Sequence, residues 1–189
     1  MSSLFIIIIA LLVFIVLVFI FIYNALVNKK NQITNAEGSM DAMLKKRFDL
    51  IPNLVDTCKV YLSHEKDVFN HLAELRTQST AGKLDISQME NINTAASKTV
   101  GNLLLMAENY PELKSSNNFI QLQAAWNETE DQIAASRRFY NTAVTEYNNA
   151  IQMFPSNIVA SIFGYKAKEV FKAAETEKAN ISAKNLFNG

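Results

Sequence analysis

Residues 4–22 form an unbroken apolar run that begins with Leu4, ends with Ile22 and contains no charge, amide or hydroxyl group. As an α-helix this run spans roughly 28 Å, which is close to the hydrocarbon thickness of a bilayer. Because a backbone in lipid must satisfy its hydrogen bonds within the segment, a helix is expected despite the many β-branched and aromatic side chains. Tyr23 follows at a position where an interfacial aromatic residue anchors a span. The run therefore predicts a transmembrane anchor over residues 1–27.

The residues on either side of the run predict its orientation. No Lys or Arg precedes it, whereas Lys29 and Lys30 follow it closely. The positive-inside rule places the short N-terminus outside the cell membrane and the C-terminal domain in the cytoplasm, in a single-pass topology. A cleaved signal peptide is disfavoured, because the run is long, has no basic residue ahead of it and precedes no small-residue cleavage site. The span carries no polar group and no Gly-x-x-x-Gly face, so any self-association is expected from the rest of the chain.

Composition excludes several classes of function. The chain has 18 Lys and Arg against 18 Asp and Glu, so no basic excess points to nucleic acid as a partner. One Cys and two His are too few for a cysteine-based zinc site or a histidine-rich metal site. The five Gly are scattered, and no glycine-rich phosphate loop occurs. We therefore expect no cofactor, and most nucleotide-dependent enzymes are disfavoured.

After the anchor, apolar side chains recur at alternating spacings of four and three residues, a pattern typical of helices in a bundle. The first such stripe predicts a helix from residue 40 that continues to Phe69 and Leu72, with a kink rather than an end at Pro52. Its positions are Met40, Leu44, Phe48, Ile51, Val55, Cys58 and Leu62.

A second helix is predicted over about residues 86–110, because Asp85 or Ser87 can cap its start and Pro111 stops it. A third is predicted over residues 119–154, where the same spacing continues without interruption. Its positions are Phe119, Leu122, Trp126, Thr129, Ile133, Ser136, Tyr140, Ala143, Tyr147, Ala150 and Phe154.

Beyond Pro155 we predict a short helix that reaches Phe163 and a last helix over about residues 168–179. The expected fold is therefore all-α, with one N-terminal transmembrane helix plus an antiparallel helical bundle of long, coiled-coil-like helices. Its expected domains are the transmembrane anchor (1–27), a cytoplasmic helical bundle (28–179) and a loose C-terminal tail (180–189).

Several segments of the chain, in order along residues 23–171, resemble the LemA family. They are YNALV at 23–27, KKRFDLIPNLV at 45–55, YLSHE at 61–65, YPELK at 110–114, FIQLQ at 119–123, RRFYN at 137–141, YN at 147–148 and FPSN at 154–157. The resemblance implies a membrane-anchored antiparallel helical bundle, usually with a cytoplasmic soluble part, and it implies no settled biochemical activity. The family includes proteins of magnetosome membranes, which adds organisation of a membrane as a function by analogy only.

A charged groove at the expected kink is the first candidate surface for a partner or for assembly. Asp49 stands three residues ahead of Pro52, as a helix cap would, and Arg47 lies beside it. Arg137 and Arg138 of the third helix are candidates for the same groove. The alternative interpretation is ordinary salt bridges on solvated helix faces.

An apolar cluster near the end of the third helix is the second candidate surface. Pro155 breaks the helix after Phe154, and Asn157 can cap the short helix that follows. Phe163 and Tyr165 come soon afterwards. The cluster either closes the end of the bundle or, where it is exposed, docks on a membrane or a neighbouring subunit.

Candidate chemistry is sparse, and no catalytic or metal-binding residue is predicted. His64 and His71 are seven residues apart, but the Glu-x-x-His spacing of a di-iron bundle is missing, which favours a solvated helix face. Cys58 lies on the apolar stripe with no His within helical reach, which favours a buried, unreactive thiol.

These observations predict a non-enzymatic, membrane-anchored scaffold or adaptor that self-associates or recruits proteins at the cytoplasmic membrane face. Its expected partners are the lipid bilayer, further copies in a homo-oligomer and an unidentified protein. The alternative is an accessory or sensory subunit that binds a small ligand or metal within the bundle. Glu65, Thr129 and Ser136 are the polar positions inside the apolar stripes and would serve that role. An enzyme would need a carboxylate pair that the sequence does not reveal.

Overall fold

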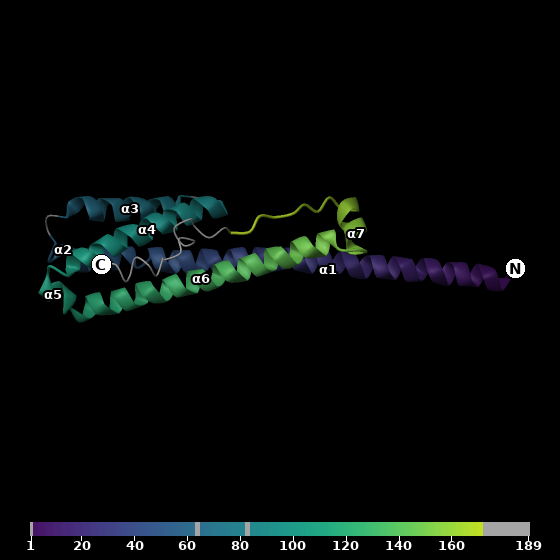
Figure 1. The fold of residues 1–189 in the computed structure, drawn as a ribbon, viewed down its shortest axis with the longest axis horizontal. Helices are drawn as coiled ribbons and strands as arrows, with labels where there is room; N and C mark the ends of the chain where they lie inside the picture. The colour runs from purple at the N-terminus through teal and green to yellow at the C-terminus, as the bar shows by residue number, and fades with distance from the viewer. Residues whose placement is uncertain (1, 63–64, 82–83, 172–189) are drawn as a thin grey trace, which may run out of the picture. The chain divides into compact units, whose positions relative to one another are not determined.

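The computed structural model describes residues 2–62, 65–81 and 84–171, and every regular element within these ranges is an α-helix (Figure 1). The helices are α1 (Ser2–Phe48), α2 (Ile51–Lys59), α3 (Lys66–Thr80), α4 (Ile86–Ala107), α5 (Pro111–Lys114), α6 (Asn117–Gln152) and α7 (Ser156–Ile162). The prediction of an all-α helical fold is confirmed. The chain forms two compact units, unit 1 from Met1–Ala36 with Arg137–Gly189 and unit 2 from Glu37–Ser136.

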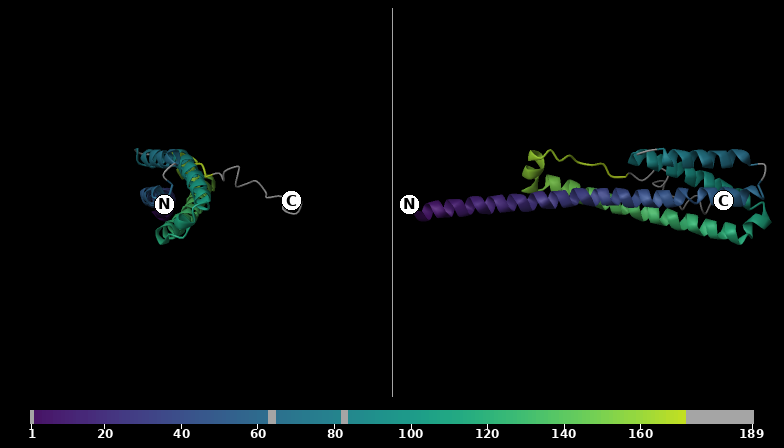
Figure 2. Two further views of the ribbon diagram at one scale, coloured as in Figure 1. Left: turned by 90° about the vertical axis from the view of Figure 1, so that its left-hand side faces the viewer. Right: turned by 180° about the vertical axis from the view of Figure 1, so that it is seen from behind.

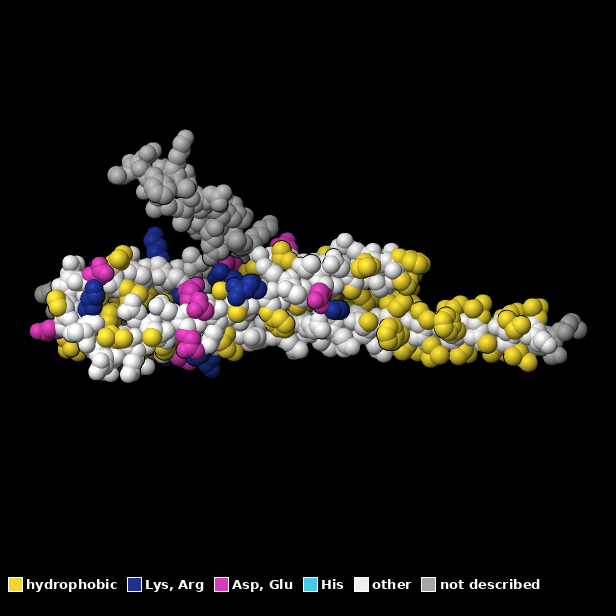
Figure 3. Space-filling model, turned by 60° about the horizontal axis from the view of Figure 1, so that its bottom comes forward, with side chains coloured by type: hydrophobic (Ala, Val, Ile, Leu, Met, Phe, Trp, Pro, Cys, Tyr) yellow, Lys and Arg dark blue, Asp and Glu magenta, His cyan; other side chains and the backbone are white. Residues whose placement is uncertain are grey.

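Helix α1 starts with the predicted span. Among the described residues it holds the one segment that is long and apolar enough to cross a membrane. Side chains 3–18 are all exposed, Leu4 to 66%. Figure 3 shows hydrophobic side chains along this part of the helix, with no Lys, Arg, Asp or Glu among them. An apolar surface of this length is unfavourable in water and is what a helix surrounded by lipid requires.

Unit 1 packs the first part of α1 against the end of α6 and against α7. Its core contains Leu26, Val159 and Ala160, which are almost completely buried. Partly buried apolar side chains surround this core, namely Phe19, Ile22, Tyr23, Ala150, Ile151 and Tyr165. The views of Figures 1 and 2 agree that α7 lies beside α1. Helix α7 therefore docks where the apolar span ends.

Unit 2 contains the end of α1, helices α2 to α5 and the beginning of α6. The predicted stripe from Met40 to Leu62 is confirmed, since all seven of its side chains are buried. Helices α3 and α4 form an antiparallel hairpin, visible in Figure 1. Their buried residues, such as Leu72, Val100 and Leu103, complete the core.

The prediction of one kinked helix through Pro52 is wrong. Helix α1 ends at Phe48 and α2 begins at Ile51, so Pro52 stands in the first turn of a new helix. Proline has no N–H to donate, and its ring clashes with the carbonyl four residues earlier, so a helix start suits it better than an interior. Helix α2 also ends at Lys59, and α3 begins only at Lys66. The apolar spacing survives both breaks because all three helices bury a face in the same core.

The helix ends after residue 80 follow the expected signals, with one exception. Asp85 caps α4 in a reciprocal capping box with Gln88, as its position predicts. Pro111 opens the short α5, and α6 ends at Gln152, ahead of Pro155. The last predicted helix is wrong at its start, because residues 165–171 are not helical, and its remainder at 172–179 lies outside the described residues, as does the predicted tail at 180–189.

Candidate functional site

Four side chains of α6 form hydrogen bonds with the main-chain atoms of a non-helical segment of the chain. Asn148 Nδ2 donates to the carbonyl of Lys168 at 2.8 Å, and its Oδ1 accepts from the Lys168 N–H at 3.0 Å. Asn141 makes the same pair of hydrogen bonds with Phe171, at 3.0 and 2.7 Å. We call Tyr140, Asn141, Tyr147 and Asn148 the backbone rail, and residues 166–171 the rail segment.

The two tyrosines of the backbone rail add a hydrogen bond each. Tyr147 Oη donates to the carbonyl of Lys166 at 2.9 Å, and Tyr140 Oη donates to the carbonyl of Glu169 at 3.3 Å. Burial raises the pKa of the Tyr147 hydroxyl, so this group stays protonated and remains a donor at neutral pH. Within the described residues, these six hydrogen bonds all end on main-chain N–H or C=O groups of the rail segment.

The repeat distances of the two partners explain why this arrangement works. Residues seven apart on an α-helix lie on the same face, about 10.5 Å apart along the axis. Three residues of extended chain cover about 10 Å. The two Tyr-Asn pairs of α6 therefore match two positions of the segment that are three residues apart. Tyr140 and Asn141 bind Glu169 and Phe171, and Tyr147 and Asn148 bind Lys166 and Lys168.

The chain reaches the backbone rail through a tight reversal after α7. Gly164 has a φ of 66°, and the N–H of Tyr165 donates to the carbonyl of Ala160 at 2.9 Å. This is a Schellman-type helix end, which requires the left-handed conformation that glycine adopts without strain. At the other end of the segment, the ring of Phe171 packs edge-on against Tyr140, with 5.0 Å between centroids.

Sequence reasoning placed Tyr140 and Tyr147 in the core and gave Asn141 and Asn148 no role. Both tyrosines are indeed buried, and their hydroxyls reach the rail segment from there. The signal that identifies the site is the Tyr-Asn dipeptide repeated at a spacing of seven residues. The dipeptide indicates a binding site only when a non-helical segment lies opposite it. That segment was predicted to be helical from residue 168 onward.

Arg47, the first residue predicted for the charged groove, is not on the surface. Arg47 is completely buried, so the prediction that it forms part of a partner surface is wrong. Its guanidinium donates to Asn93 Oδ1 at 2.6 Å and to Ser97 Oγ at 3.0 Å, and it forms an ion pair with Glu130. It also lies 4.1 Å from the centroid of the Trp126 ring. A buried guanidinium is tolerated here because these partners, from α4 and α6, replace the water that would otherwise hydrate it.

The other members of that groove are placed as follows. Asp49 is exposed one residue before Leu50, the N-cap of α2, and α2 has no side-chain cap, so the capping role predicted for Asp49 is wrong. Pro52 is half-buried. Arg137 is half-buried and Arg138 is exposed; both belong to unit 1, so a groove shared with residues of unit 2 stays a prediction.

The second predicted surface lies at the turn between α6 and α7. Phe154 is 80% exposed, and Pro155 and Asn157 are exposed beside it. Phe163 is half-exposed, and its ring packs against Tyr23 at 4.6 Å between centroids. Tyr165 packs on the unit 1 core.

The predicted polar candidates are placed among the described residues as follows. Within ranges 2–62, 65–81 and 84–171, no three His, Cys, Asp or Glu side chains lie close enough to hold an ion. His64 lies outside these ranges, and His71 faces Glu74 at 3.9 Å on an exposed surface. Burial raises the pKa of the Cys58 thiol to about 11. Thr129 and Ser136 donate to carbonyls of their own helix, and Glu65 is half-buried.

An apolar helix long enough to cross a membrane, continuing into helical units, defines a class of membrane-associated helical proteins. The chain belongs to the LemA family, whose model matches residues 36–184. It is 26% identical over 165 residues to Protein LemA of Metamycoplasma hominis, which covers 87% of this chain and 75% of that protein. It is also 26% identical over 190 residues to Magnetosome protein MamQ 2 of Paramagnetospirillum magneticum, with 87% and 70% covered. Neither name indicates an enzyme, and the apolar helix together with these relatives indicates membrane anchoring.

Proposed function

We propose that this protein is a non-enzymatic scaffold, anchored with its helical units at the cytoplasmic face of the membrane, that self-associates through its backbone rail. In one chain, the rail holds that chain's own residues 166–171. In an assembly, the rail of one copy holds the same segment of a neighbouring copy. Organisation of the membrane by such arrays follows from this proposal and is consistent with the likeness to magnetosome proteins.

The observation that carries the proposal is that the rail binds main-chain atoms. An exchanged segment therefore makes the same six hydrogen bonds as the chain's own segment. Exchange of identical elements between copies costs little in contacts. Anchoring in a membrane also raises the local concentration of neighbouring copies, which favours the exchanged state.

The rail also suits an adaptor that holds an extended segment of another protein. Self-association is the simpler form, because the chain supplies both the rail and a segment that fits it. A ligand within the bundle is not supported by Thr129 or Ser136, whose hydroxyls already bond within α6.

Complementation between two defective variants tests the exchange. Variant A carries Asn141→Ala and Asn148→Ala, which removes four of the rail's hydrogen bonds but leaves the segment intact. Variant B carries Lys168→Pro and Phe171→Pro, which removes the two N–H donors of the segment but leaves the rail intact. The matched controls are Asn149→Ala on α6 and Ala167→Pro in the segment, because neither residue takes part in the six hydrogen bonds described above.

The masses of full-length proteins in nanodiscs, measured by mass photometry, give the result. We expect the parent chain and both controls to form dimers or larger assemblies, and variants A and B to be monomeric alone but to associate when mixed. A parent chain that is monomeric at all densities contradicts self-association. Assemblies of variant A that match the parent chain contradict the role of the rail and leave the scaffold without a known contact.

A further inference from the structure

Two segments that are far apart in the sequence lack charged side chains. Helix α1 has none before Lys29. Residues 147–165 form a second such stretch, 19 residues long, between Glu146 and Lys166. This second stretch contains the end of α6, the turn at Pro155 and all of α7.

The charged ends of both segments lie together in unit 1. Lys29 Nζ lies 2.5 Å from Glu146 Oε2, which pairs the first charge of α1 with the last charge of α6. Lys30 Nζ lies 5.9 Å from the ring centroid of Tyr165, the residue before Lys166. The first charges after the span therefore lie beside the two ends of the second stretch, and we call Lys29, Lys30 and Glu146 the charged layer.

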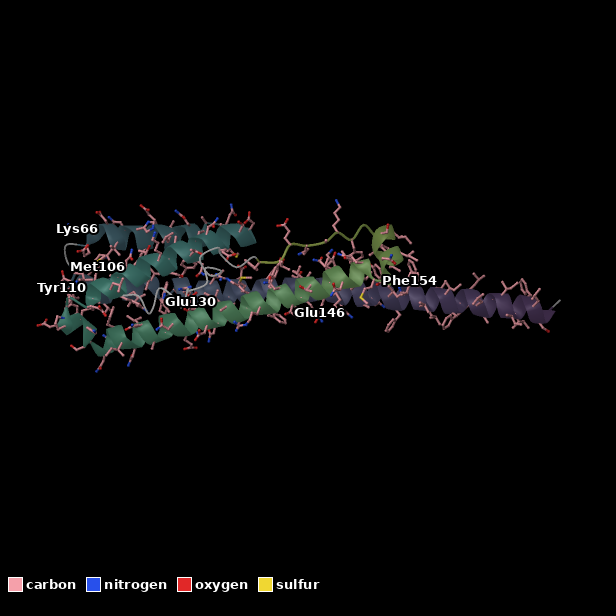
Figure 4. All side chains as sticks on the ribbon, viewed as in Figure 1. Lys66, Met106, Tyr110, Glu130, Glu146 and Phe154 are labelled. Carbon is pink, nitrogen blue, oxygen red and sulfur yellow. The ribbon has the colours of Figure 1, made fainter. Side chains whose placement is uncertain are left out.

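The charge-free side of this layer carries an exposed apolar surface. Its exposed side chains are Met153, Phe154, Ile158, Ile162 and Phe163. We call residues 153–163 the apolar tip; Figure 4 labels Phe154 at this turn and Glu146 further back along α6. Phe163 packs against both Phe19 and Tyr23, with ring centroids 6.1 and 4.6 Å away. Because Phe19 belongs to the membrane span, the tip lies at the depth where that span enters the membrane.

We infer that the apolar tip is a second, non-spanning membrane element, which embeds among the lipids of the leaflet that the end of the α1 span crosses. The tip is continuous with the span, and their common boundary is the charged layer at Lys29 and Glu146. Its backbone suits such a site, since the N–H groups of Asn157 and Ile158 donate to the carbonyls of Met153 and Pro155. Polar residues such as Asn157 and Ser161 among the apolar ones are typical of an element in the headgroup region rather than in the hydrocarbon core.

Depth measurement by spin labelling tests this inference. Phe154→Cys and Ile162→Cys are each made in a Cys58→Ser chain and spin-labelled, and the full-length protein is reconstituted into vesicles of phosphatidylcholine and phosphatidylglycerol in equal parts. The matched control is Val170→Cys, since Val170 is also an exposed aliphatic residue of unit 1 but lies beyond Lys166. Collision rates with oxygen, which concentrates in lipid, and with a water-soluble nickel chelate are then compared.

At the two tip positions we expect an oxygen-to-nickel collision ratio at least tenfold higher than at Val170. A ratio equal to that at Val170 overturns the inference. Protection from both reagents, with spin–spin broadening that disappears when unlabelled protein is added, also overturns it, because a second copy would then cover the tip. The measurement is made at high lipid excess, so it does not depend on the proposed self-association.

Discussion

Arg47 connects three helices of unit 2 through a single side chain. It comes from the end of α1, and its partners Asn93 and Glu130 come from α4 and α6. Arg47 follows two lysines in the sequence, and such a run of charges is typical of a helix surface. For this reason the sequence alone predicted Arg47 to be exposed. Its burial depends on partners about 50 to 80 positions away, whose approach no local pattern encodes. The apolar positions around it were predicted correctly because a heptad stripe is a local property of the helix.

Replacement of Arg47 by Met should lower the free energy of unfolding of unit 2 by about 3 kcal/mol, because it leaves the buried Asn93 without its donor and removes the hydrogen bond to Ser97 and the ion pair with Glu130. Lys46→Ala is the matched control; Lys46 is exposed and its contact with Glu128 is 3.5 Å long, so a loss below about 1 kcal/mol is expected. Urea titration of the full chain in detergent micelles measures both. Trp126 is the only Trp and stacks on Arg47, so its fluorescence reports the transition. Equal losses for the two variants would contradict the role given to Arg47.

Cys58 should react slowly with iodoacetamide while the protein is folded. Its raised pKa of about 11 leaves about a hundredfold less thiolate at neutral pH than an ordinary thiol has, and only the thiolate reacts. Its labelling rate should rise about tenfold per pH unit between pH 7 and pH 10, because the fraction ionised rises by that factor below the pKa. An exposed thiol made by Lys59→Cys in a Cys58→Ser chain should react faster and level off near pH 9. Comparable rates for both thiols would show that Cys58 is accessible.

At the scale of elements, the sequence predicted which segments are helical better than where helices end. The start of α4 was correct because Asp85 and Gln88 form a local capping signal. The breaks after Phe48 and Lys59 were missed because helices packed on one core keep the same apolar spacing across a break. The segment from Lys168 was predicted to be helical from its amphipathic pattern, whereas side chains of α6 accept and donate its main-chain hydrogen bonds and stabilise an extended form.

Gly164→Ala should destabilise unit 1 by about 1 kcal/mol, because a side chain at a φ of 66° is strained even where space is free. Amide exchange of residues 165–171 should accelerate, since this turn positions them on the rail. Gly101→Ala is an informative control, because Gly101 lies inside α4 with open space around it. That change should instead stabilise the protein by roughly 0.5–1 kcal/mol through helix propensity. Effects of the same sign, measured by thermal unfolding and hydrogen exchange, would contradict this account.

At the scale of the whole molecule, a helix able to cross a membrane could be predicted from the sequence, because lipid imposes a simple rule on composition and length. The apolar tip was identified as a surface from its side chains, but its position beside Phe19 and Tyr23 required the structure. The backbone rail required it too, since hydrogen bonds to main-chain atoms leave no trace in the side chains of the segment that is bound.

The topology can be tested with a thiol reagent that does not cross membranes. In a Cys58→Ser chain, Thr145→Cys on the exposed surface of α6 should be labelled only after cells are permeabilised, because the positive-inside rule places it in the cytoplasm. Ser3→Cys, ahead of the span, should be labelled in intact cells. The reverse pattern would show the opposite orientation, and labelling of both sites in intact cells would exclude a cytoplasmic location of Thr145.

The order in which the segments of the two units occur along the chain has a consequence for biogenesis. Unit 2 is one continuous stretch, Glu37–Ser136, whereas unit 1 combines the two ends of the chain. Because a ribosome adds about 5–20 residues per second from the N-terminus, the span can enter the membrane and unit 2 can fold while the partners of unit 1 are still being made. Until α7 is synthesised, Leu26 has none of its α7 core neighbours. Unit 1 is thus completed last, at the membrane surface, by a nascent chain that is already held there.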